Sequence, residues 1–142
     1  MSETSAHKWL KKSVFHSSDR FSRIENIVGD GTPDVNCCIQ GNEFWLETKS
    51  PREPKKPGTP LFGSNHKFSQ EQKNWFLAQR NAKGKGGLFI YTDKNIFLVK
   101  QEFVDCINEM TVDEIRSVAL WFSTKPCGKY LCDCLRIAFM GL

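Results

Sequence analysis

The chain has 142 residues, a length that suits one domain with a single hydrophobic core. Its net charge of +4, from 20 Lys and Arg against 16 Asp and Glu, is too small to indicate nucleic-acid binding by itself. No segment approaches the roughly 20 apolar residues of a membrane span, and the first residues lack the apolar region of a signal peptide. We therefore expect one domain over residues 1–142, in the cytoplasm, with no membrane partner.

The first elements in chain order are a helix and a strand. Residues 6–15 predict a short helix, because apolar residues repeat on one side of it and lysines lie on the other. Residues 20–28 predict a strand, and the glycines that follow predict a turn. Glu25 then has two open roles: it reaches a metal site on the neighbouring strand as a third carboxylate, or it forms an edge salt bridge with Arg20 or Arg23.

The next stretch predicts a β-hairpin. Residues 35–40 and 43–49 are strand-like runs, and the dipeptide at residues 41–42, Gly-Asn, suits a tight turn that needs positive φ. In that register Asp34 lies opposite Lys49. Because successive side chains of a strand point to opposite faces, one face of the hairpin is apolar and belongs to the core. That face carries Val35, Cys37, Ile39, Phe44, Leu46 and Thr48.

The other face of the hairpin gathers charged groups. Asp34 and Glu47 become diagonal neighbours, with Cα atoms roughly 7–8 Å apart, and both carboxylates can converge on one hard cation such as Mg²⁺. Lys49 adds an ammonium group that can hold a water molecule or stabilise charge on a phosphate. This combination is typical of a metal-assisted phosphodiester hydrolase. The alternative is a solvated strand surface with a cross-strand ion pair.

Residues 51–67 have a different composition, with four prolines, two glycines and five basic residues including a histidine. Proline ends the preceding strand, and the rest of the segment cannot form regular structure. The segment is either a basic arm that follows DNA phosphates or a solvated connector. In the first case the DNA-binding residues are Arg52, Lys55, Lys56 and Lys67.

A helix is predicted over residues 69–83, because Ser69 and Gln72 form a capping box and glycines from Gly84 onward end it. Gln72 lies one turn before two aromatic residues of the core. Two roles are open for its side chain: it points into the active cleft and binds phosphate or a metal-bound water, or it only caps the helix.

The last third of the chain predicts two strands, two helices and an apolar tail. The strands cover residues 88–91 and 96–100, and residues 101–108 predict a short helix. A second capping box opens a helix over residues 111–122. The tail, residues 131–139, is either a final strand or a subunit contact.

The six cysteines are expected to be free thiols, because disulfides are rare in the cytoplasm. Cys127, Cys132 and Cys134 come closest to a ligand cluster, but their spacing matches no common zinc pattern and no histidine lies nearby. Their role stays open, with a zinc-bound interaction domain as one alternative.

Four segments together resemble the PD-(D/E)xK nuclease superfamily, and within it the stand-alone VRR-NUC nucleases of phages, which are related to Holliday junction resolvases. The segments are residues 23–26, 31–36, 45–49 and 69–72, the last followed by Trp75. The resemblance covers the chain from Arg23 to about Tyr91. The proline-rich loop is unusual for the family, and the cysteine-rich tail has no counterpart in it.

The resemblance implies an α/β fold with a restriction-endonuclease-like core, in which helices flank a mixed central β-sheet. It also implies dependence on Mg²⁺ or Mn²⁺ and assembly as a homodimer. The expected location is the cytoplasm of a bacterial or phage-infected cell. The resemblance assigns Asp34 and Glu47 as metal ligands and Lys49 as the catalytic lysine, with Gln72 and Glu25 as further site residues. A main-chain carbonyl near Thr48 would complete the protein ligands of the metal.

The expected function is that of a metal-dependent endodeoxyribonuclease that hydrolyses DNA phosphodiester bonds. Kinship with resolvases favours branched or junction DNA as the substrate. If the protein is an enzyme, the alternative is a sequence-specific duplex endonuclease of the homing or restriction type. If it is not an enzyme, the alternative is a DNA-binding module that uses only the basic loop.

Overall fold

In the computed structural model, residues 3–25, 31–63 and 66–142 are described, and within them six strands form one mixed sheet. The strands lie in chain order across the sheet, and every neighbouring pair is antiparallel except β3 and β4, which are parallel. They are β1 (Arg20–Arg23), β2 (Val35–Ile39), β3 (Asn42–Lys49), β4 (Gly86–Tyr91), β5 (Asn95–Lys100) and β6 (Trp121–Thr124).

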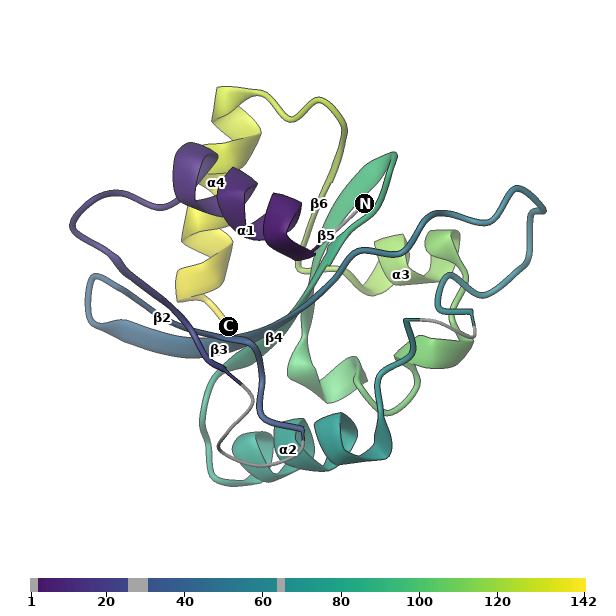
Figure 1. The fold of residues 1–142 in the computed structure, drawn as a ribbon, viewed down its shortest axis with the longest axis horizontal. Helices are drawn as coiled ribbons and strands as arrows, with labels where there is room; N and C mark the ends of the chain where they lie inside the picture. Colours follow the sequence, from purple (N-terminus) through teal and green to yellow (C-terminus); the bar gives the residue numbers. More distant parts are fainter. Residues whose placement is uncertain (1–2, 26–30, 64–65) are drawn as a thin grey trace.

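Helices cover both faces of the sheet (Figure 1). The helices α1 and α4 pack on one face, and α2, α3 and two short 3₁₀ turns pack on the other. Because α2 connects the parallel strands β3 and β4, it forms the crossover that such a pair requires. The bounds are α1 (Glu3–Ser13), α2 (Gln70–Asn81), η1 (Gln101–Phe103), η2 (Ile107–Glu109), α3 (Val112–Val118) and α4 (Lys129–Met140).

The central strand β4 shows why the sheet is covered on both faces. Phe89 belongs to the core beneath α1 and α4, whereas Leu88 and Ile90 belong to the core on the α2 and α3 side. All three side chains are fully buried. A strand buried on both faces needs a continuous apolar run, which is what residues 88–91 supply. The α/β class with a mixed sheet is therefore confirmed.

The hairpin of β2 and β3 forms as predicted, but its turn lies one residue earlier. Ile39 pairs with Asn42, so Gln40 and Gly41 are the two turn residues, with φ values of 49° and 81°. The Asn42 side chain donates a hydrogen bond to the Ile39 carbonyl at 3.2 Å, which favours Asn42 as the first strand residue and not as a turn residue. Two consecutive residues with positive φ define the turn type that matches strand twist.

Because the register differs from the prediction by two residues, each side chain keeps its expected face. The apolar face is buried as predicted. The polar face is not a wet surface, however, since Asn36 and Glu47 are only 8% and 5% exposed. Trp75 of α2 packs over this face, with its ring 5.3 Å from that of Trp45. Continuing the observed register would place Asp34 directly opposite Glu47.

The strand predicted over residues 20–28 is shorter in the structure. Its strand β1 ends at Arg23, which pairs with Val35, the first residue of β2, so no partner strand is present beyond that point among the described residues. Glu25 consequently lies outside the strand. The turn predicted after this strand falls partly on residues 26–30, which lie outside the described residues.

The helix predicted over residues 111–122 is too long. Its capping box is present, but α3 ends at Val118. The Leu120 amide donates to the Leu98 carbonyl, and Phe122 pairs with Phe97, so the chain continues as the edge strand β6. Pairing with β5 therefore outweighs the apolar periodicity that favoured a longer helix.

Two other elements also differ from the prediction. Residues 101–108 form the 3₁₀ turns η1 and η2 in place of one helix. The apolar tail is the helix α4 and not a strand, and its buried residues Cys132, Leu135 and Phe139 recur at helical spacing.

Candidate active site

The predicted site residues meet at one cavity. It lies where β2 begins and β3 ends, next to the second turn of α1 and the first turn of α2. Its volume is about 330 Å³. Four of the five predicted catalytic residues line it, while Glu25 is exposed and is not among its lining residues. The lining residues are His7, Arg23, Ile24, Thr32, Asp34, Glu47, Lys49 and Gln72.

The Asp34 carboxylate is held by a donor on each oxygen. Oδ1 accepts a hydrogen bond from the Thr48 amide at 2.9 Å, and Oδ2 lies 3.0 Å from His7 Nε2. The Asp34 carbonyl accepts from the Ile24 amide at 2.8 Å, which ties the start of β2 to the segment after β1. The carboxylate of Asp34 is therefore fixed at the mouth of the cavity, with its side chain 21% exposed.

Glu47 and Gln72 connect β3 with the first turn of α2. Gln72 Nε2 donates to Glu47 Oε2 at 3.1 Å. The other end of the same amide, Oε1, accepts from the Ser69 amide at 2.9 Å, and the Ser69 hydroxyl accepts from the Gln72 amide at 3.1 Å. Gln72 therefore caps the helix and also lines the cavity, where its amide contacts Glu47. Binding of phosphate or a metal-bound water by this side chain stays a prediction.

Lys49 follows Glu47 on the same face of β3. Its ammonium lies 3.9 Å from Glu47 Oε2, donates to the Lys67 carbonyl at 3.4 Å, and lies 5.1 Å above the Phe68 ring. Phe68 is itself fixed, because the Asn108 side chain bonds both its amide and its carbonyl, at 2.9 and 3.0 Å. The end of the proline-rich loop thus determines where the lysine points.

His7 is the site residue that the sequence analysis missed. It is 3% exposed, and its Nε2 lies near both Asp34 and the Thr48 hydroxyl, at 3.0 and 3.2 Å. A signal was present, since His7 occupies the apolar face of the first helix with Leu10 and Val14, at i, i+3 and i+7. A histidine among core positions has a packing explanation as well, so spacing alone does not identify it.

The residues present fit a hard divalent cation. Asp34 and Glu47 supply carboxylate oxygens to one cavity, and oxygen ligands are those that Mg²⁺ prefers, with water or phosphate filling the other positions. The Thr48 side chain is buried on the opposite face, so only its main-chain carbonyl is a candidate ligand. Among the described residues, no group of three or more His, Cys, Asp or Glu forms a ready-made metal cage.

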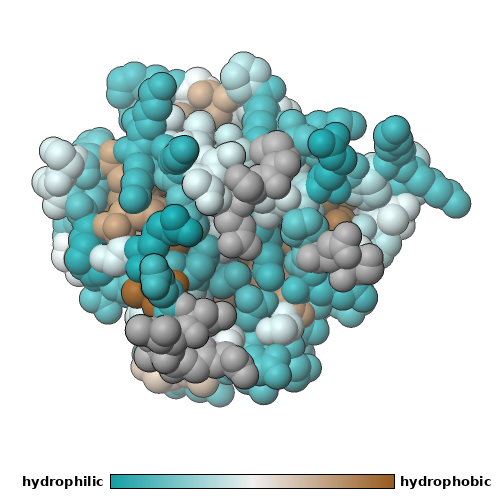
Figure 2. Space-filling view, in the orientation of Figure 1, coloured by the Kyte–Doolittle hydropathy of each residue, from teal (hydrophilic) through white to brown (hydrophobic). Residues whose placement is uncertain are grey.

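The four predicted DNA-binding residues, Arg52, Lys55, Lys56 and Lys67, all lie at the surface of the loop, and none of them lines the cavity. The α1 lysines Lys8, Lys11 and Lys12 are also exposed, and Arg23 lies on the cavity wall. Exposed basic groups are therefore present on α1 and in the loop, and Arg23 and Lys49 line the cavity itself. Figure 2 shows a mainly hydrophilic face in which hydrophobic side chains form small, separate patches.

The loop of residues 51–67 lacks helix and strand in its described part, as predicted, but it is fastened to the domain. The Glu53 amide donates to Asp93, and its carboxylate accepts from Thr92 Oγ1 and Asn95 Nδ2 at 2.5 and 2.6 Å. Further along, Pro60 forms a bridge with Thr111, and Leu61 and Phe62 are buried. The segment is therefore neither a free arm nor a wholly solvated connector.

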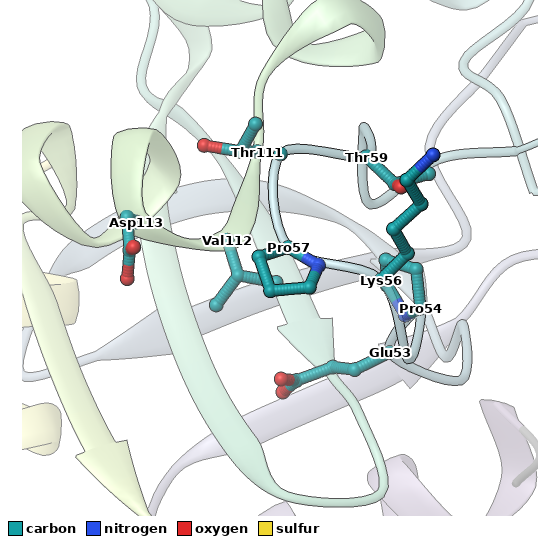
Figure 3. A pocket seen from close by; sticks show the side chains of 9 residues that line it. Glu53, Pro54, Lys56, Pro57, Thr59, Thr111, Val112 and Asp113 are labelled. Carbon is teal, nitrogen blue, oxygen red and sulfur yellow. The ribbon is translucent and has the colours of Figure 1, made fainter.

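A second cavity, of about 200 Å³, lies between this loop and the start of α3. Figure 3 shows the Glu53 side chain reaching beneath Pro57, whereas Lys56 extends the other way, past Thr59. The anchoring group and the basic group of the loop thus point in different directions. In Figure 1 the loop runs past α3 to the edge of the molecule and returns.

The late cysteines are free thiols. The sulfur atoms of Cys127 and Cys132 lie 3.5 Å apart. Burial, together with the hydrogen bond that the Cys132 thiol shares with the Cys127 sulfur, raises the pKa of the Cys132 thiol to about 11, so this thiol stays protonated near neutral pH. In the part of the chain that the structure describes, these cysteines belong to no group that could bind a metal, so the zinc alternative has no ligand set there.

Comparison with known proteins finds similarity in structure but not in sequence. No protein-family model and no curated protein matches the chain. The structure is similar to the 1.6 Å structure of Hjc, a Holliday junction resolvase from the hyperthermophilic archaeon Archaeoglobus fulgidus, with a TM-score of 0.55. The match covers 81% of this chain and 88% of the resolvase, at 11% sequence identity.

A similarity at this identity establishes the fold. The chain therefore has the α/β fold of a solved junction resolvase, which confirms the predicted restriction-endonuclease-like core. The narrower resemblance to phage VRR-NUC nucleases stays a prediction.

None of the described helices combines the length and the apolar character that crossing a bilayer demands.

Proposed function

We propose that the protein is a metal-dependent endodeoxyribonuclease that cuts branched DNA, in the manner of a PD-(D/E)xK enzyme of the VRR-NUC type. The observation that carries this proposal is the convergence of Asp34, Glu47 and Lys49 on one cavity, each held by an identified partner. The fold of a Holliday junction resolvase supports it.

In this mechanism Asp34, Glu47 and the Thr48 carbonyl would hold Mg²⁺, or Mn²⁺ in its place. The bound ion would lower the pKa of a water ligand and stabilise charge that develops on the scissile phosphate. Lys49 orients the attacking water and adds positive charge next to the phosphate. Gln72 keeps the Glu47 carboxylate aimed at the cavity. We expect products with 5′-phosphate and 3′-hydroxyl ends.

The basic groups around the site supply the DNA affinity. Two carboxylates hinder the approach of a polyanion unless a cation screens them, so a bound metal would support the exposed lysines of α1 and of the loop in attracting DNA. A four-way junction has two strands to cut, which a homodimer with two sites would accomplish by symmetry. We therefore also propose a homodimer, to be measured by light scattering.

The test is a cleavage panel at fixed salt, because DNA affinity varies steeply with salt concentration. The substrates are a four-way junction, a fork, a flap, and nicked, linear and single-stranded DNA, each with Mg²⁺, Mn²⁺ or EDTA. We expect cleavage of branched forms with metal only, and a loss of roughly 10²–10³-fold in Asp34→Asn, Glu47→Gln and Lys49→Ala. The matched control is Glu43→Gln, an exposed glutamate of the same strand.

Each result of the panel has a distinct meaning. Full activity of Glu47→Gln, or cleavage in EDTA, would end the assignment of the site. Cutting of one linear duplex sequence in preference to branched forms would favour an enzyme of the homing or restriction type. Tight binding in EDTA without cleavage of any form would show a non-catalytic DNA-binding module.

A further inference from the structure

The buried imidazole of His7 is not explained by packing alone. Its ring lies among core residues, with Phe21 edge-on at 5.7 Å, and the residue is 3% exposed. Its Nδ1 is buried and has no hydrogen-bond partner among the described residues. A buried polar atom without a partner is unfavourable, and an apolar side chain of similar size would avoid it. A histidine at this position therefore lowers the stability of the folded protein relative to an apolar residue of similar size.

The other ring nitrogen shows what the histidine contributes. Nε2 lies 3.0 Å from Asp34 Oδ2 and 3.2 Å from the Thr48 hydroxyl. An ionised carboxylate can only accept, so Nε2 carries the hydrogen and donates it to Asp34. In the neutral ring this leaves Nδ1 as the acceptor without a partner among the described residues. Nε2 is thereby occupied as a donor and has no lone pair to offer to a metal.

Together with the Thr48 amide, this contact fixes the Asp34 carboxylate from two directions. Thr48 donates to Oδ1 from β3, and His7 donates to Oδ2 from α1. A carboxylate with a donor on each oxygen loses its freedom to rotate, but each oxygen keeps a lone pair for a cation. Such partners of metal ligands orient the ligand, and their removal typically weakens metal binding by about 10–100-fold.

We propose that His7 is a positioning residue, which uses its Nε2–H to orient the Asp34 carboxylate for a divalent cation. This inference rests on the proposed function, because it presupposes that Asp34 binds metal. It adds a residue from α1 to a site otherwise built from the hairpin and α2. It also gives α1 a role besides covering the sheet.

The experiment measures Mn²⁺ binding by calorimetry to the whole protein without DNA. Wild type is compared with Asp34→Asn, His7→Ala and His7→Gln, with circular dichroism to check folding. We expect His7→Ala to bind Mn²⁺ about 10–100-fold more weakly. His7→Gln should bind within roughly threefold of wild type, because its amide can donate to Asp34 in place of the imidazole. His16→Ala, at an exposed histidine, is the matched control and should bind normally.

Cleavage supplies a second readout. If His7 acts by orienting a metal ligand, raising the Mn²⁺ concentration should restore cleavage by His7→Ala, whereas Asp34→Asn should stay inactive. Should His7→Ala fail to fold, His7→Leu fills the volume of the ring and serves in its place.

Two results would overturn the inference while leaving the proposed function intact. The first is Mn²⁺ affinity of folded His7→Ala, or of His7→Leu, that equals wild type. The second is equally weak binding by His7→Gln and His7→Ala, which would make the imidazole a metal ligand and not a positioning group. If wild type binds no Mn²⁺, or if Asp34→Asn binds Mn²⁺ with the affinity of wild type, the proposed metal site itself is wrong. The proposed role of His7 is then wrong as well.

Discussion

Gln72 donates a hydrogen bond from Nε2 to Glu47 Oε2 at 3.1 Å, and with its Oε1 it completes the capping box of α2. One side chain thus both begins a helix and holds a carboxylate of the site. The two functions can be separated by mutation, because the other half of the capping box is the Ser69 hydroxyl, which accepts its hydrogen bond from the Gln72 amide.

Replacing Ser69 and Gln72 in turn should therefore give different results. Ser69→Ala should destabilise the protein by about 1 kcal/mol through loss of the cap, with cleavage close to wild type. Gln72→Ala should cost a similar amount of stability and also reduce cleavage by about 10–100-fold, because Glu47 loses the group that orients it. Urea denaturation and junction cleavage measure the two effects. Equal cleavage by the two variants would contradict the role of Gln72 at the site.

The face of each hairpin residue could be predicted, although the turn could not. A Gly-Asn dipeptide and a Gln-Gly dipeptide both permit the turn, and the choice depends on the contact of the Asn42 side chain with the Ile39 carbonyl. An error of two residues in register preserves the faces, whereas an error of one would have exchanged them. For this reason the sequence brings Asp34, Glu47 and Lys49 to one face even with the turn one residue away from its observed position.

Features that depend on tertiary contacts could not be predicted. The apolar periodicity around Phe122 predicts a helix, whereas the structure pairs this residue with Phe97 of β5, a contact that local periodicity does not reveal. His7 reaches Asp34 across 27 residues of sequence, and only the docking of α1 on the sheet brings the two together. The burial of Glu47 likewise follows from the position of α2 over the hairpin.

The buried ion pair of Asp19 with Arg136 should make stability depend on pH in the acid range. Two guanidinium nitrogens donate to the Asp19 carboxylate, and the two side chains are 2% and 9% exposed. The hydrogen bond from Arg136 lowers the pKa of Asp19 below its ordinary value. A lowered folded-state pKa adds stability above the unfolded pKa of about 3.9, and that stability is lost as pH falls through the folded value.

Asp19→Asn is the matching variant. We expect it to lose about 3–5 kcal/mol at pH 7, because Arg136 would stay buried without its charged partner. Its stability should also fall less steeply than that of wild type below about pH 4, since the substituted amide side chain does not titrate. Urea denaturation between about pH 3 and 7 measures both effects. Asp133→Asn, which removes an exposed i,i+4 partner of Lys129, should change stability by less than about 0.5 kcal/mol.

Glu53 should control how firmly the proline-rich loop is held. Its carboxylate accepts hydrogen bonds from Thr92 and Asn95, so Glu53→Ala should increase local opening of the loop without unfolding the domain. Trypsin reports this opening at Lys55, since the bond after Lys56 precedes a proline. We expect cleavage at Lys55 to become about tenfold faster. Glu102→Ala, at an exposed glutamate outside the loop, should leave the rate unchanged, and an equal rate in both variants would refute the anchor.

Lys55 and Lys56 should contribute to DNA affinity through phosphate contacts alone. Both lie at the surface of a loop that is fastened at each side, so they approach the phosphates without a large cost of ordering. For Lys55→Ala/Lys56→Ala we expect weaker binding to every DNA form, and a slope of log K against log salt that is shallower by up to about 2. Binding is measured by anisotropy between roughly 50 and 200 mM salt, a range in which such contacts have most of their effect. Lys129→Ala, on α4, is the control and should leave the slope unchanged, because its ammonium is already paired with Asp133. An unchanged slope in the double variant would mean that these two lysines do not contact DNA phosphates.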